Sequence, residues 1–144
     1  MIALEECLIF LLAKAYQHVN SVARTRLESF GVTPTQYALL HVLWEHGPQS
    51  GAALGARLRL DSASITGLID RLAHLGLVER SPDPTDRRES LVALTIRGAE
   101  LQAPLQEAIA AFNAELDAIL GAAESARLRA LLRGLISAYP LPTR

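Results

Sequence analysis

Two short runs of β-forming residues flank a turn-rich decapeptide near the middle of the chain. Leu77–Arg80 and Leu91–Leu94 are predicted strands, and Ser81–Ser90 between them contains prolines, aspartates and two adjacent arginines. This loop is longer than the roughly two to five residues of a simple hairpin. Because exposed loops often carry function, it is the first candidate site. A lone hairpin in a chain of otherwise helical pattern predicts a mainly α fold with a small β-hairpin.

The segments before the hairpin have helical spacing of apolar residues and are bounded by typical helix-end residues. Thr33-Pro34-Thr35-Gln36 has the form of a capping box with proline at the first helical position. Two short helices joined by a few residues then predict a helix-turn-helix. The predicted helices run from Ala3 to about Phe30, from this capping box to about His46, from a Ser50 cap to about Arg59, and from a cap at Asp61 or Ser62 to Gly76.

After the hairpin, Thr95 is the expected cap of a long helix from about Ile96 to Leu120, which Pro104 is expected to bend. A last helix is predicted from about Ala123 to Ala138. The order α-α-α-α-β-β-α-α is that of a winged helix framed by long terminal helices. We expect a single domain over 1–144, in which 33–95 form the winged lobe and 1–30 and 96–144 form dimerisation helices.

Composition limits the class of protein more than it identifies the function. The length of 144 residues suits one domain, and the single cysteine, Cys7, excludes an internal disulfide. The N-terminus lacks the basic region of a signal peptide, and no apolar run has membrane-spanning length, so we expect a cytoplasmic protein without membrane contact. The net charge of −1 does not indicate nucleic-acid binding. Seven arginines nevertheless lie in one central stretch: Arg57, Arg59, Arg71, Arg80, Arg87, Arg88 and Arg97.

The segment that begins at Asp61 has the character of a DNA-reading helix. Small hydroxyl side chains at a helix start can enter the major groove and donate hydrogen bonds to base edges. Ser62, Ser64 and Thr66 offer such donors, and Gly67 allows close approach. The apolar positions Ile65, Leu68, Ile69 and Leu72 should be core. We expect Asp70 to pair with Arg71 or Arg57 rather than to read a base.

Several motifs together resemble the MarR family of bacterial transcription regulators, over nearly the whole chain. The most specific is the sequence from Asp86 to Thr95, which is similar to the family's wing signature of Asp, any residue, Arg, then an apolar strand ending Leu-Thr. The supporting elements are Leu68-Ile69-Asp70-Arg71-Leu72, Gly76-Leu77-Val78, Arg80 and Gly98.

The resemblance implies a DNA-binding transcriptional regulator, expected to be a repressor. Arg88 would then enter the minor groove while Asp86 orients it, and Arg87 would meet a phosphate. A narrow minor groove concentrates negative potential that suits a guanidinium. The alternative is that Asp86 and Arg88 only brace a surface hairpin. The predicted DNA-contacting residues are Ser62, Ala63, Ser64, Thr66, Gly67, Arg71, Asp86, Arg87 and Arg88.

The terminal helices carry apolar stripes that have no second core within one chain. The family's solution is a homodimer whose two recognition helices lie about 34 Å apart on a pseudo-palindromic operator; the alternative is that these helices pack only on their own chain. Family members often release DNA on binding a small aromatic or phenolic effector. The candidate pocket residues are Tyr16, Asn20, Tyr37, His41 and Trp44, although Tyr37 and Trp44 also suit a core.

Other classes of function receive less support from the residues. A winged-helix module for protein contacts is one alternative. A thiol-based redox-sensing regulator acting through Cys7 is another, but no lysine or arginine lies within four residues of this cysteine to stabilise its thiolate. His18, His41, His46 and His74 form no metal-ligand spacing, so neither metal nor other cofactor is expected. The chain has no phosphate loop or nucleophile motif, and we expect no enzymatic activity.

Overall fold

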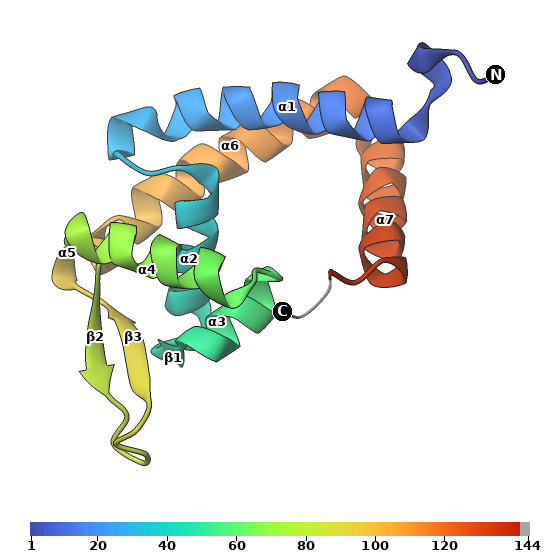
Figure 1. Cartoon of the computed structure of the whole chain (residues 1–144). Coiled ribbons are helices and arrows are strands. Elements are labelled where there is room, and N and C mark those ends of the chain that lie inside the picture. Colours follow the sequence, from blue (N-terminus) through green and yellow to red (C-terminus); the bar gives the residue numbers. More distant parts are fainter. Residues whose placement is uncertain (142–144) are drawn as a thin grey trace.

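The computed structural model describes residues 1–141. A small winged lobe, residues 33–95, lies beside three long helices (Figure 1). The last three residues of the predicted segment 96–144 lie outside the described part. In chain order the elements are η1 (Leu4–Glu6), α1 (Leu8–Leu27), η2 (Glu28–Phe30), α2 (Pro34–His46), β1 (Gln49–Ser50), α3 (Gly51–Leu58), α4 (Ser62–His74), β2 (Val78–Pro82), β3 (Ser90–Leu94), α5 (Ile96–Glu100), α6 (Gln102–Leu120) and α7 (Ala122–Ala138), where η denotes a short 3₁₀-helix.

The predicted N-caps are confirmed. Thr33 and Gln36 form the reciprocal capping box at the start of α2. The side chains of Ser50, Asp61 and Thr95 accept hydrogen bonds from backbone N–H groups in the first turns of α3, α4 and α5. These bonds satisfy donors that would otherwise be free, which explains why four helix starts could be read from local sequence.

Two predicted helices are interrupted. The segment from Ala3 to Phe30 contains a break at Cys7, whose ψ of 113° is extended, and it ends in η2 before the left-handed Gly31. The segment from Ile96 to Leu120 is divided between α5 and α6 at Leu101. Pro104 has no N–H to offer the carbonyl of Glu100 four residues earlier, so the proline separates the helix into two where a bend was expected.

The hairpin is longer than predicted, and it belongs to a three-stranded antiparallel sheet of order β1-β3-β2. Pairing of Pro82 with Ser90 extends both strands into the expected loop, which shortens to residues 83–89. The strand β1 was not predicted. It has two residues, and Gln49 and Ser50 pair with Val92 and Leu91.

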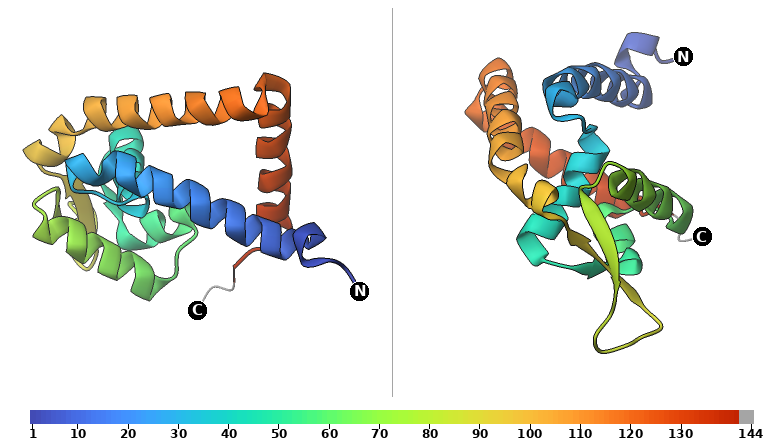
Figure 2. Two further views of the ribbon diagram at one scale, coloured as in Figure 1. Left: turned by 90° about the horizontal axis from the view of Figure 1, so that it is seen from above. Right: turned by 90° about the vertical axis from the view of Figure 1, so that its left-hand side faces the viewer.

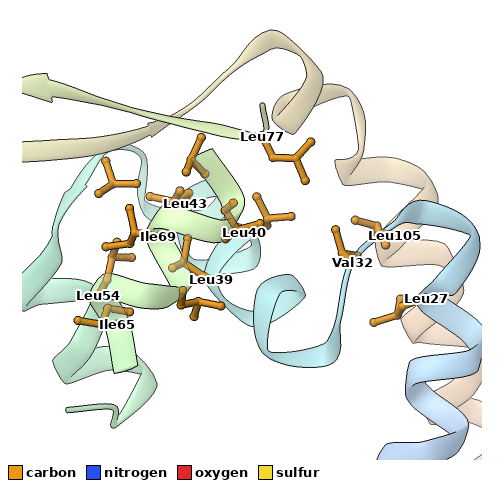
Figure 3. Packing of buried hydrophobic residues seen from close by; sticks show 14 residues of the cluster. Leu27, Val32, Leu39, Leu40, Leu43, Leu54, Ile65, Ile69, Leu77 and Leu105 are labelled. Atoms are coloured by element: carbon orange, nitrogen blue, oxygen red, sulfur yellow. The ribbon is translucent and has the colours of Figure 1, made fainter. Parts of the chain in front are cut away.

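The hydrophobic core lies within the lobe and extends to the long helices (Figure 3). The predicted core positions of α4 are confirmed, since Ile65, Leu68, Ile69 and Leu72 are all buried. Leu27 of α1 and Leu105 of α6 are fully buried against the same cluster. The lobe is therefore attached to both long helices by apolar packing, which limits how freely it can turn on them.

The helices α1, α6 and α7 form three sides of an open frame (Figures 1 and 2). Arg26 of α1 makes a two-bond ion pair with Glu115 of α6 at 2.8 Å for each bond, and its guanidinium lies over Phe112. At the α6–α7 corner, Gly121 has a φ of 85°, and Asp117 of α6 accepts hydrogen bonds from Ser125 and Arg129 of α7.

Packing within one chain leaves the apolar stripes of this frame uncovered. On α1, Tyr16 is 67% exposed, and on α7, Leu131 is 56% exposed. Further exposed apolar residues are Leu4, Leu8, Ile9, Leu11, Leu12, Val19 and Val22 near the N-terminus, and Ile119, Leu120, Leu128, Leu132, Leu135, Ile136, Tyr139 and Leu141 near the C-terminus. No helix within residues 1–141 is both long and apolar enough to cross a membrane.

Candidate nucleic-acid interface

The N-terminal turn of α4 is exposed and polar, whereas its opposite face is buried. The Asp61 carboxylate accepts a 2.7 Å hydrogen bond from the Ser64 amide, and this bond lowers the pKa of Asp61 below its ordinary value. Ser62, Ala63 and Ser64 are exposed. The Thr66 hydroxyl donates to the Ser62 carbonyl at 2.8 Å, so in the free protein its hydrogen is engaged within the helix. The Ser64 side chain also hydrogen-bonds the Asp61 carboxylate, so Ser62 is the freer hydroxyl donor on this turn.

Gly67 gives room to a neighbouring arginine. A Cβ at this position would lie 3.3 Å from Nη1 of Arg71, which places the Arg71 guanidinium over the preceding turn of α4. The predicted cation is thus on the same helix face as Gly67 and is exposed. A phosphate approaching this face would meet both the charge and the space that glycine leaves.

Asp70 has a different partner from the one expected. Its carboxylate accepts a 2.7 Å hydrogen bond from Arg80 of β2, and the predicted pairing with Arg71 or Arg57 is wrong. Arg57 instead has Nη1 at 3.1 Å from Nε2 of His46. The partner was missed because Arg80 reaches α4 only after β2 turns back on the helix. This ion pair fixes the base of the wing to the helix that it flanks.

The wing loop is ordered by two aspartates. Asp83 accepts hydrogen bonds from both the backbone amide and the hydroxyl of Thr85, each at 2.8 Å, and these bonds lower the pKa of Asp83. Asp86 accepts from the backbone amide of Arg88 at 3.0 Å, and its carbonyl accepts from the Glu89 amide. Asp86 therefore shapes the backbone that carries Arg88 rather than contacting the guanidinium.

Arg87 and Arg88 are exposed at the tip of the wing. Among residues 1–141, neither arginine forms an ion pair. The ion pair between Asp86 and Arg88 that would brace the hairpin in the alternative interpretation is therefore not formed. The hairpin projects from the lobe well beyond the helices (Figure 2). Two cationic side chains on a projecting, ordered loop beside an exposed polar helix start form a winged helix-turn-helix, an arrangement that DNA-binding proteins use.

A cavity of 640 Å³ lies where α1 meets the start of α2. Of the predicted pocket residues, Tyr16 and Asn20 line it, and Arg24 continues their face of α1 at the same four-residue spacing. That spacing could have identified Arg24 from sequence. The full lining is Tyr16, Gln17, Asn20, Ser21, Arg24, Thr25, Glu28, Gly31, Val32 and Thr33.

The other predicted pocket residues, Tyr37, His41 and Trp44, lie outside that lining and stack along α2. The ring centroid of Tyr37 lies 5.7 Å from that of His41 and 6.0 Å from that of Trp44. Burial raises the pKa of Tyr37, and Trp44 donates from Nε1 to the Gly98 carbonyl at 3.0 Å. Both rings pack against the core, which agrees with the alternative that sequence analysis left open for them.

The remaining candidate groups do not gather into a site within the described residues. Cys7 is a half-buried free thiol between η1 and α1, and a role in redox sensing stays a prediction. Between residues 1 and 141, no three His, Cys, Asp or Glu side chains come together as metal ligands would.

Comparison with known proteins agrees with the class of fold. The model of the MarR family matches residues 32–90. A relative, the HTH-type transcriptional repressor NicR of Pseudomonas putida, is 41% identical over 91 residues, which are 63% of this chain and 58% of NicR. The matched part of the chain thus spans less than two thirds of that relative's length.

Two solved structures extend the similarity over most of the chain. A probable transcriptional regulator from Pseudomonas aeruginosa is 35% identical, with a TM-score of 0.86 over 93% of this chain and 100% of the other. Bordetella bronchiseptica BpsR, whose DNA binding is regulated by 6-hydroxynicotinic acid, is 27% identical, with a TM-score of 0.86 over 94% of this chain and 96% of BpsR. The chain belongs to the MarR family of transcriptional regulators.

Proposed function

We propose that the chain is a transcriptional repressor that binds a pseudo-palindromic operator as a homodimer and is released by a small aromatic acid. The observation that carries the proposal is the pairing of an exposed, Asp61-capped helix start with an ordered wing whose arginines have no ion-pair partner among residues 1–141. The name of NicR supports repression as the direction of control.

Reading of DNA is divided between the two projections. Ser62 and Ser64 at the start of α4 meet base edges in the major groove, and Arg71 meets a phosphate beside them. Arg88 enters the neighbouring minor groove and Arg87 binds its phosphates. The wing strand β2 lies beside α4, where the Asp70–Arg80 ion pair at 2.7 Å joins them, so both grooves can be engaged together.

The homodimer covers the apolar stripes of the frame. Continuous exposed apolar surface on a soluble chain is a mark of an interface. Here the stripes lie on α1 and α7, away from the wing, so pairing two frames leaves both reading helices free (Figure 1). Two copies related by a twofold axis would then face two half-sites about one DNA turn, roughly 34 Å, apart.

The cavity between α1 and α2 is the effector site. Its volume of 640 Å³ is within the usual range of ligand pockets. Arg24 can pair with a carboxylate, Asn20 and Thr33 can hydrogen-bond ring substituents, and Tyr16 offers an aromatic face. The regulation of BpsR by 6-hydroxynicotinic acid, a hydroxylated aromatic acid, supports this class of ligand.

The test is selection of duplexes from a random-sequence library by the wild-type protein, followed by binding with Arg88→Ala. In a dimer this substitution removes two minor-groove cations, so affinity should fall by about 10- to 100-fold. Arg87→Ala removes one proposed phosphate contact from each protomer, so it should make the slope of log affinity against log salt shallower by about 1.8, at roughly 0.9 for each lost phosphate neutralisation. Arg127→Ala, which removes an exposed arginine of α7, is the matched control and should change neither quantity.

The same experiment tests the protein-contact alternative. If the wild type selects no duplex, or if Arg88→Ala binds the selected duplex as the wild type does, DNA reading by the wing is refuted. A winged-helix module for protein contacts would then account better for the exposed hairpin.

A further inference from the structure

Trp44, the only tryptophan of the chain, belongs to α2 in the lobe. Its side chain contacts α5 just before the break between α5 and α6. The indole Nε1 donates to the Gly98 carbonyl at 3.0 Å. Gly98 lies in the last turn of α5, where carbonyl groups have no intrahelical donor. Because the helix stops at Glu100 and restarts at Gln102, a side chain from α2 can take this acceptor.

Gly98 also lies against Leu77, in the segment that connects the recognition helix α4 to β2. A Cβ at Gly98 would lie 2.0 Å from the Leu77 carbonyl oxygen, so only glycine permits this approach. Around it, Thr95 donates from its amide to Leu77 at 3.1 Å and from its hydroxyl to Gly76 at 2.7 Å. Arg97 donates to the Leu75 carbonyl at 3.2 Å. The start of α5 is thus bonded, through its N-cap Thr95 and the Arg97 side chain, to the segment that connects α4 to the wing.

These contacts lie between the part that reads DNA and the part that would dimerise. The chain passes from α5 across Leu101 into α6, which forms one side of the frame (Figure 1). The lobe is covalently joined to the frame there and at residues 31–33, between η2 and α2. A contact that holds α5 against the lobe therefore holds the residues that immediately precede α6.

We propose that Trp44 is a positioning residue for DNA reading, which sets the recognition-helix spacing of the dimer by holding α5 against the lobe. The inference rests on the proposed function, because spacing has meaning only if two lobes read one operator. Trp44 itself packs against the core and contacts Gly98, so it is not assigned to the DNA surface.

The variant that tests this role is Trp44→Phe, which removes the N–H donor and keeps an aromatic ring in the core. Tyr37→Phe is the matched control: it removes the Tyr37 hydroxyl, which lies 3.4 Å from Nδ1 of His41, on the same helix and away from α5. Amide hydrogen exchange of residues 95–101 should become about fivefold faster in Trp44→Phe than in the wild type, as expected for one lost hydrogen bond. Tyr37→Phe should leave these rates unchanged.

The second measurement uses the palindromic duplex that the wild type selects from a random library, and the same duplex lengthened by one central base pair. The ratio of the two affinities should fall by about fivefold in Trp44→Phe, because a loosely held lobe tolerates the wrong spacing. If amide exchange is faster in Trp44→Phe but the ratio of the two affinities is unchanged, Trp44 is merely structural and the inference is overturned. Unchanged amide exchange in Trp44→Phe would overturn it as well. If the wild type selects no duplex, the proposed function fails, whereas the exchange rates still decide whether Trp44 holds α5.

Discussion

Substitution of Gly98 by alanine should destabilise the protein far more than a single added methyl group usually does. The new Cβ would lie 2.0 Å from the Leu77 oxygen, so one backbone must move by about 1 Å to reach even the 3.0 Å limit of real Cβ contacts. Overpacking of this kind costs about 1–3 kcal/mol. The shift also strains the bonds from Thr95 to Leu77 and from Trp44 to Gly98, at about 1 kcal/mol each.

The helix propensity of alanine offsets about 0.5–1 kcal/mol of this cost, which leaves a net loss of about 3 kcal/mol. For a chain of 144 residues such a loss lowers Tm by about 10 °C. Urea and thermal unfolding should be measured at one fixed protein concentration, because the proposed dimer would add to apparent stability. Gly51→Ala is the matched control, since its Cβ would make an ordinary 3.8 Å contact with Ile69. A loss below about 0.5 kcal/mol in Gly98→Ala, within ordinary mutational scatter, would refute the argument from close approach.

Two further predictions concern the frame. Leu131→Glu places a charge within the exposed apolar stripe of α7, so sedimentation at micromolar concentration should show monomers in place of a dimer. The control Glu124→Gln, on the same helix, should leave the dimer intact. If Leu131→Glu is still a dimer, this stripe is not part of the interface. The hydrogen bonds from Ser125 and Arg129 hold the pKa of Asp117 below its ordinary value of 3.8, so the stability they give is present above that pH and is lost as the pH falls through the lower folded-state pKa. Urea unfolding near pH 7 and at about pH 2–3 should show this loss in the wild type and a smaller one in Asp117→Asn, and equal pH dependence would contradict it.

Features that depend on neighbouring residues were predictable from the sequence. Thr33, Ser50, Asp61 and Thr95 were identified as caps because the cap and its amide partner lie within three residues of each other. The alternation of buried and exposed positions in α4 follows from helical spacing in the same way. The caps and the helical spacing depend on residues within the same short segment, so they can be recognised from one sequence.

Features that depend on distant residues were missed or misassigned. The two-residue strand β1 exists only because β3 pairs with it, and a run of that length has no periodicity to detect. Asp70 was given Arg71 or Arg57 as its partner, whereas Arg80 is brought to it by the turn from α4 into β2, which local spacing does not reveal. Tyr37 and Trp44 were named as pocket residues for their chemistry, whereas the alternative of a core position, which their helical spacing offered, is the one that the structure has.

The placement of the arginines reconciles DNA reading with a net charge of −1. Arg26, Arg80 and Arg129 are paired with carboxylates at the α1–α6, α4–β2 and α6–α7 contacts, where they hold the architecture together. The wing-tip arginines lie on an exposed loop ordered by Asp83 and Asp86. A diffuse basic surface would bind DNA at almost any separation of the two lobes, and a change of spacing would hardly weaken it. A few placed cations bind well only at the correct separation, so the scarcity of positive charge is what would let a small ligand that changes this separation release the DNA.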